Sequence, residues 1–224
     1  MYPIQVLVFQ LHGSLRVDED YITSKDAYCA SWKTVDSESG VSKTEISVCS
    51  AVNINDCLVS NLDVGNRTTI CKADLEFKEG VKYVTRVRST NVVGRSSEML
   101  SDGFVVDSTP PIMGEVIHVE NPPSEEQSQV FTHSKISVEW SGFVDLESGV
   151  KKYYLCLGTE SGTCNFLNFT DVGNSTSYTY EDLHLTQGET YFVSIKAENM
   201  AGLISDVQSS SGATVDKTGI VNCF

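Results

Sequence analysis

The sequence predicts an all-β protein built from two antiparallel β-sandwiches in tandem. Residues 35–41 (VDSESGV) return almost unchanged as residues 144–150 (VDLESGV), and Tyr83 returns 108 residues later as Tyr191. A repeat of that length is one domain long, rather than one turn of a solenoid. Runs that alternate apolar and polar residues recur about every 10 to 15 positions, between Gly, Ser, Asn and Asp, which is typical of a sandwich.

The first module is expected to cover residues 1–108. The apolar residues 4–11 predict its opening strand, and Tyr83 begins a later strand that carries Arg86 and Arg88 on its outer face. Pro3 and Ile4 match Pro111 and Ile112 of the second copy, so the chain is interpreted as starting on the first strand of a module, as a fragment of a longer protein would.

Consecutive prolines in residues 107–111 (DSTPP) predict a short, stiff link to a second module, residues 109–217. Two strands stand out in it. Residues 136–140 place Ile, Val and Trp on one face, and residues 191–197 place Tyr, Val, Ile and Ala on one face. Residues 215–218 (VDKT) echo residues 106–109 (VDST), so residues 218–224 are interpreted as the start of a truncated third module.

The charge excludes some classes of partner. The formal net charge is −14, and Lys and Arg do not cluster, whereas nucleic acids and anionic membranes attract clustered basic residues. No stretch approaches the ~20 apolar residues of a membrane span. We therefore expect neither nucleic-acid binding nor direct membrane insertion by this fragment, and we attribute the acidity to solubility.

Comparison of the two copies predicts three disulfides among the seven cysteines. Two pairs share the spacing C-x7-C at an offset of 107 and flank turn-like segments, which suits bridges across hairpins. Another two cysteines map onto Ser137 and Thr179, so both are missing together from the second module, as bonded partners would be. The assigned pairs are Cys49–Cys57, Cys156–Cys164 and Cys29–Cys71, with Cys223 left for a partner beyond the fragment.

One geometric conflict accompanies the third pair. On simple alternation Cys29 faces away from Trp32, whereas Cys71 shares a face with Phe77, so a bulge or bend must intervene. Reduced thiols in a cytosolic protein are the alternative to disulfides. Zinc is disfavoured, because no two cysteines have C-x2-C spacing.

Three sequons support an extracellular or cell-surface location, where disulfides also persist. The acceptors are Asn66, Asn168 and Asn174, and the first and third occupy equivalent positions after a shared Val-Gly. The expected protein is therefore a disulfide-bonded glycoprotein.

Each copy resembles a fibronectin type III module. The resemblance rests on Trp32 and Trp140 in the second strand, and on an apolar residue and a Gly before the Tyr that opens the sixth strand, at Phe77-x-x-Gly80-x-x-Tyr83 and Leu185-x-x-Gly188-x-x-Tyr191. It implies an immunoglobulin-like fold in which Tyr83 and Tyr191 bond back to the preceding loop. Long arrays of such modules in large animal extracellular or cell-surface proteins are similar to this chain.

Catalytic and metal sites are not expected. His12, His118, His133 and His184 occupy non-equivalent positions without a nucleophile motif beside them. Asp145 and Glu147 follow the Trp strand, and together with Asp107 they could bind calcium at the module junction. We favour a turn role for these acidic residues, since Asp and Ser satisfy local backbone groups and Gly supplies a positive φ.

Ligand recognition in this family uses the loop after the sixth strand, residues 91–95 and 199–203. Neither loop contains Arg-Gly-Asp, and the Asn-x-x-Gly pattern is interpreted as a turn. The expected function is a non-catalytic spacer and adhesion module that contacts other proteins and neighbouring modules, without a cofactor. A ligand-binding receptor ectodomain and accessory modules of a secreted enzyme remain alternatives.

Overall fold

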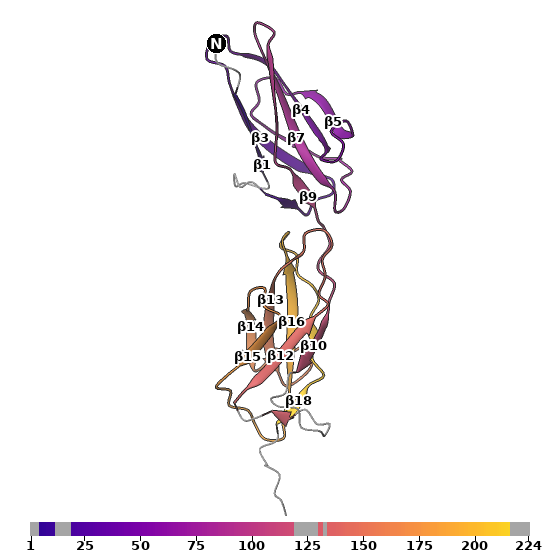
Figure 1. Ribbon diagram of the computed structural model, residues 1–224, viewed down its shortest axis with the longest axis vertical. Helices are drawn as coiled ribbons and strands as arrows, with labels where there is room; N and C mark the ends of the chain where they lie inside the picture. Colours follow the sequence, from indigo (N-terminus) through magenta and orange to yellow (C-terminus); the bar gives the residue numbers. More distant parts are fainter. Residues whose placement is uncertain (1–4, 12–18, 119–129, 132–133, 216–224) are drawn as a thin grey trace, which may run out of the picture. The chain divides into compact units, whose positions relative to one another are not determined.

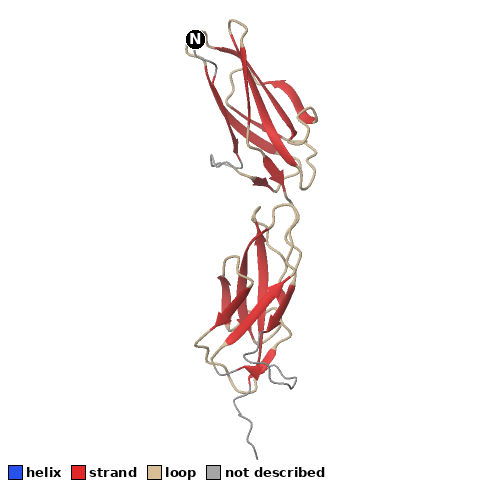
Figure 2. Cartoon of the chain, in the orientation of Figure 1, coloured by secondary structure: helices blue, strands red, loops and turns tan. Residues whose placement is uncertain are grey.

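The computed structural model describes residues 5–11, 19–118, 130–131 and 134–215. The chain divides into two compact units, Met1–Thr109 (unit 1) and Pro110–Phe224 (unit 2). Figures 1 and 2 show strands and loops, and the described residues form no helix. The predicted fold class is confirmed: each unit is an immunoglobulin-like sandwich of two sheets. The division follows Thr109, one residue beyond the expected boundary.

The described residues of unit 1 form nine strands. The three-stranded sheet has the order β1-β3-β6, and the six-stranded sheet has the order β2-β9-β7-β4-β5 with β8 also paired to β7. The bounds are β1 Gln5–Leu11, β2 Tyr21–Ile22, β3 Tyr28–Val35, β4 Val41–Ser50, β5 Cys57–Asp63, β6 Thr69–Lys72, β7 Lys82–Asn91, β8 Ser96–Leu100 and β9 Phe104–Val106.

Unit 2 repeats this arrangement. Its sheets have the orders β10-β12-β15 and β11-β18-β16-β13-β14, with β17 also paired to β16. The bounds are β10 Glu115–His118, β11 Val130–Phe131, β12 Ile136–Ser141, β13 Val150–Gly158, β14 Leu167–Asp171, β15 Ser177–Tyr180, β16 Thr190–Asn199, β17 Gln208–Ser209 and β18 Ala213–Val215.

One short strand in each unit departs from the expected antiparallel pairing. β2 pairs parallel with β9, and β11 pairs parallel with β18. In both units the strand before it, β1 or β10, belongs to the opposite sheet. The start of each unit therefore contributes to both sheets of the sandwich.

The core of each unit lies between the sheets. Trp32 and Trp140 each expose 3% of their surface, and Tyr83 and Tyr191 expose 4% and 2%. Phe104 packs against Tyr28, Phe77 and Tyr83 in unit 1. Burial of such large rings supplies much of the apolar stabilisation of a small sandwich.

A left-handed residue resolves the conflict in strand alternation between Cys71 and Phe77. β6 ends at Lys72, and Asp74 then has a φ of 57°, which resets the direction of the side chains. Leu75 and Phe77 consequently point into the core while Cys71 stays exposed. Asp182, with a φ of 53°, does the same in unit 2. Asp adopts this backbone region more readily than most residues do.

Candidate functional site

The turn after β3 is organised by the carboxylate of Asp36. Its Oδ1 accepts hydrogen bonds from the backbone N–H groups of Ser39 (2.8 Å) and Glu38 (3.1 Å). Its Oδ2 accepts a bond from Nδ2 of Asn91, at the end of β7 (3.0 Å). The bond from the Ser39 backbone, and then that from Asn91, lower the pKa of Asp36 to about 2. The carboxylate is therefore already used within its own unit.

The same asparagine builds the loop after β7. Oδ1 of Asn91 accepts the backbone N–H of Arg95 (2.8 Å), and the Asn91 carbonyl accepts the N–H of Gly94 (3.0 Å). Gly94 has a φ of 83°, a conformation that glycine adopts at no steric cost. Residues 91–95 form the turn that the Asn-x-x-Gly pattern predicts. The N–H of Val92 also reaches the carbonyl of Gly40 (3.2 Å), which joins the two loops directly.

Unit 2 repeats this pair of tied loops. Asn199 Nδ2 donates to Asp145 Oδ2 (2.9 Å), and Asn199 Oδ1 accepts the N–H of Leu203 (2.8 Å). Asp145 Oδ1 accepts the N–H groups of Ser148 (2.8 Å) and Gly149 (3.0 Å). The sequence predicted both turns separately and missed the Asp–Asn bond between them. The sequence did contain a signal for this bond, because Asp36 and Asn91 recur together as Asp145 and Asn199.

The calcium alternative stays a prediction. It involves Asp107 of unit 1 and Asp145 and Glu147 of unit 2. Within unit 1, Asp107 is fully buried and accepts the N–H of Thr109 (3.1 Å). Together with the bonds of Asp145, this contact favours the turn role.

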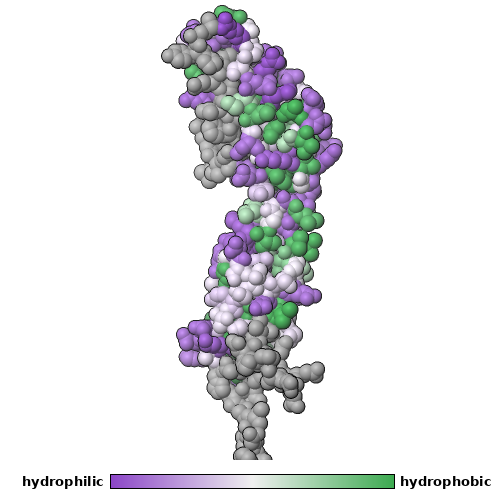
Figure 3. Space-filling view, viewed as in Figure 1, coloured by the Kyte–Doolittle hydropathy of each residue, from purple (hydrophilic) through white to green (hydrophobic). Residues whose placement is uncertain are grey.

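The tied loop of unit 1 has an apolar tip. Val92 and Val93 each expose 68% of their surface, whereas Met200 at the corresponding tip of unit 2 exposes 49%. Figure 3 shows apolar side chains among hydrophilic ones on the drawn face of both units. The turn therefore presents two adjacent exposed apolar side chains on a hydrogen-bonded backbone.

The disulfide Cys29–Cys71 joins directly paired residues of β3 and β6. Both cysteines lie on the outer side of their sheet, because Tyr28, Ala30 and Trp32 point into the core. In unit 2 the paired residues at this place are Ser137 and Thr179, whose hydroxyls share a hydrogen bond of 3.0 Å. A hydrogen bond thus occupies the position of the missing disulfide.

The other two bonded pairs are Cys49–Cys57 and Cys156–Cys164. The expected equivalence at an offset of 107 is wrong in detail. Cys49 lies opposite Val84, whereas Cys156 lies opposite Ser194, which corresponds to Arg86 of unit 1. Relative to the neighbouring strand, the two cysteines therefore differ in position by two residues. Cys57 pairs directly with Cys49 across the β4–β5 hairpin, while Cys164 precedes β14 in a loop.

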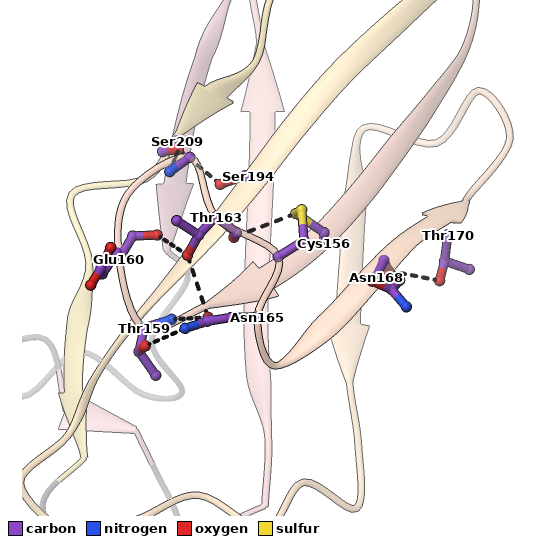
Figure 4. The surroundings of a disulfide bond; sticks show 11 residues. Cys156, Thr159, Glu160, Thr163, Asn165, Asn168, Thr170, Ser194 and Ser209 are labelled. Atoms are coloured by element: carbon purple, nitrogen blue, oxygen red, sulfur yellow. Dashed lines mark hydrogen bonds between the residues drawn. A yellow bond between two sulfur atoms is a disulfide. The ribbon is translucent and has the colours of Figure 1, made fainter.

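The loop of the second pair folds back over the outer face of its sheet (Figure 4). The N–H of Gly162 donates to Ser209 Oγ (2.9 Å), and Ser209 shares a bond of 2.8 Å with Ser194. Thr163 lies so close to Gly158 that a Cβ there would meet the Thr163 carbonyl oxygen at 2.3 Å. The close approach therefore requires glycine at position 158, and it leaves Cys156 fully buried although it points outward.

The two equivalent tyrosines of the repeat form backbone hydrogen bonds, and the sequon asparagines are exposed. The hydroxyl of Tyr83 accepts the N–H of Lys78 (3.1 Å), and that of Tyr191 accepts the N–H of Thr186 (3.2 Å), which are the tyrosine corners that the resemblance implies. All three sequon asparagines are exposed, namely Asn66, Asn168 and Asn174.

Some residues that the sequence singles out lie outside the described residues or outside the sites above. Cys223, His12, His133 and residues 218–224 lie outside the described residues. His184 is exposed, and His118 ends β10. The described part of the chain contains no helix with the length and apolar character of a membrane span.

Two solved structures similar to this chain contain fibronectin type III domains. The fibronectin(III)-like modules of Clostridium thermocellum CbhA align over 94% of this chain and 94% of that chain, at 12% identity and a TM-score of 0.46. The FN1–FN3 domains of chicken CNTN1 align over 85% of this chain and 64% of that chain, at 16% identity and a TM-score of 0.40. Both TM-scores are below 0.5, so the fold assignment rests on strand order and core. No protein-family model and no curated protein matches the chain.

Proposed function

We propose that the two units are non-catalytic extracellular modules that act as spacers and present fixed loops for contact with other proteins. The observation that carries the proposal is the tied loop pair, built twice. In each unit an Asp–Asn bond of 2.9 or 3.0 Å joins the turn after the Trp strand to the turn after the Tyr strand. Loops held in one conformation lose little entropy on binding, which favours a contact role.

The extracellular part of the proposal is supported by the covalent chemistry. Six of the seven cysteines are bonded in three pairs, and disulfides persist mainly in oxidising compartments. The exposed asparagines at positions 66, 168 and 174 are accessible to a glycan.

The contact surface proposed in unit 1 is the valine tip, defined as Val92 and Val93. The turn that carries it is closed by the bond from the Arg95 N–H to Asn91 and joined to Gly40. Two neighbouring apolar side chains that are already exposed bury surface on contact without rearrangement of the loop.

Attachment of animal cells to a surface coated with the full chain tests this function. We expect a panel of cell lines to attach above the uncoated level, and the double variant Val92→Asp/Val93→Asp to abolish attachment. Val52→Asp is the matched control, because Val52 is 94% exposed in the loop between β4 and β5. Attachment by no line, or equal loss in the control, would refute the contact role of the tip.

A further inference from the structure

The outer face of the six-stranded sheet in unit 2 carries an unusual group of side chains. We call it the tyrosine–lysine face, and it consists of Lys152, Tyr154, Phe169, Lys196 and Glu198. Lys152, Tyr154 and the buried Cys156 alternate with Tyr153, Leu155 and Leu157, which point into the core. Tyr154 lies directly opposite Lys196, and Lys152 lies opposite Glu198. The face is therefore a continuous surface across three strands.

Most charges on this face are already paired. Lys152 forms ion pairs with Asp171 (2.8 Å) and Glu198 (3.7 Å), and Lys151 reaches Glu198 at 3.4 Å. The hydroxyl of Tyr154 donates to Glu198 Oε2 at 2.5 Å, which fixes the ring on the sheet. The hydrogen bond with Asp171 also raises the pKa of Lys152, so this lysine stays charged.

Lys196 is the exception. Its ammonium lies 4.2 Å from the centre of the Phe169 ring and 5.5 Å from that of Tyr154. Among the described residues, no carboxylate comes within ion-pair distance of it. Contact with two ring faces holds a cation in place without neutralising its charge. Lys196 is thus a positioned, half-buried positive charge between two aromatic surfaces.

Unit 1 has a carboxylate at the position that Tyr154 occupies in unit 2. Arg88 corresponds to Lys196, and the residue directly opposite it is Glu45, in the place of Tyr154. The ion pair that Glu45 forms is with Lys43, at 2.6 Å. The acidic residue beside the cation in unit 1 is replaced by an aromatic ring in unit 2. The sheet itself does not need that replacement, because both units have the same strand order.

The charge around the face favours an acidic partner. Only five basic residues, all lysines, follow Thr109, against 15 Asp and Glu. Three of these five lysines, at positions 151, 152 and 196, place their ammonium groups on or beside this face. Because Glu198 and Asp171 pair with Lys151 and Lys152, the positive charge left over on this surface is that of Lys196. The surface also offers Ile204, which is 45% exposed and directly paired with Glu198.

We propose that the tyrosine–lysine face binds a protein segment that carries a carboxylate next to an apolar side chain. The carboxylate pairs with Lys196, and the apolar group packs on Tyr154, Phe169 and Ile204. Tyrosine is enriched among the residues that dominate binding energy at protein interfaces. This surface belongs to unit 2 and is distinct from the valine tip, so either proposal can fail without the other.

A displayed library of random peptides, selected against the full chain, tests the proposal. We expect enriched peptides to contain Asp or Glu beside an aromatic or aliphatic residue. Synthetic copies of these peptides should bind about tenfold more weakly to Lys196→Gln and to Tyr154→Glu, which introduces the unit 1 residue. Lys135→Gln is the matched control, since Lys135 is an exposed lysine paired with Glu181.

Thermal unfolding of each variant verifies that it folds, and Lys196→Gln removes the charge while keeping an unbranched, polar side chain that is slightly shorter than lysine. Enrichment without acidic residues would overturn the proposal. So would equal binding to wild type and Lys196→Gln, or an equal loss in Lys135→Gln, because the last result would indicate a general effect of charge.

Discussion

At the scale of single residues, the loops of each unit depend on one carboxylate and one carboxamide. Asp36 and Asn91 each make bonds to their own turn and one bond to each other. Asn91 is 94% buried in these contacts, since only 6% of its surface is exposed. Burial of an amide is favourable only when its hydrogen bonds are made, so the pair fixes both turns together.

Replacing Asn91 by alanine should raise the pKa of the Asp36 carboxyl from about 2 toward the ordinary value of an aspartate, although the bond from the Ser39 backbone remains. A carboxyl whose pKa is lower in the folded state stabilises the fold above its unfolded pKa of about 4. That contribution is lost as the pH falls toward 2. NMR titration of the Asp36 carboxyl checks the shift, and an unchanged pKa in Asn91→Ala would contradict it.

Gly158 is a second point at which one residue decides local structure. A methyl group at this position meets the carbonyl oxygen of Thr163 at 2.3 Å, so Gly158→Ala must displace the disulfide loop. We expect a loss of about 1–3 kcal/mol in the free energy of unfolding of unit 2. Urea denaturation measures it, and Ser161→Ala in the same exposed loop is the control. Equal stability of the two variants would show that the loop adapts without strain.

At the scale of elements, the two units link equivalent pairs of strands by different kinds of bond. A disulfide joins β3 to β6, whereas the Ser137–Thr179 hydrogen bond joins β12 to β15. The edge strands also differ from ideal ladders. β5 shifts register twice and contains Asn61 with a φ of 45°, and β14 shifts register once. Irregular edges discourage unwanted pairing with other chains.

The Ser137–Thr179 pair should accept an engineered disulfide. Ser137→Cys/Thr179→Cys places two cysteines in the register that Cys29 and Cys71 have in unit 1. In the loop-entropy model, closing a loop of this length stabilises by up to about 4 kcal/mol. Denaturation under oxidising conditions, with Ser137→Cys alone as control, measures the gain. Two titratable thiols in the folded double variant would show that the geometry is unsuitable.

At the scale of the whole molecule, the net charge of −14 and the exposed sequons both favour solubility. In protein secreted from animal cells we expect glycans on Asn66, Asn168 and Asn174, because all three side chains are exposed. Removal of N-glycans should shift the mass in three steps, and each Asn→Gln variant should lose one step. Absence of glycan from secreted material would contradict the proposed modification.

The sequence by itself determined the all-β class, the doubling, the core Trp and Tyr positions and the choice of cysteine partners. These features follow from local alternation and from comparison of two copies, which need no knowledge of strand pairing. The tertiary structure decided the parallel pairing of β2 and β11, the two-residue difference between Cys49 and Cys156, the Asp–Asn bonds and the tyrosine–lysine face. Each of these depends on register between segments far apart in the chain, and a shift by even one residue changes which side chains meet.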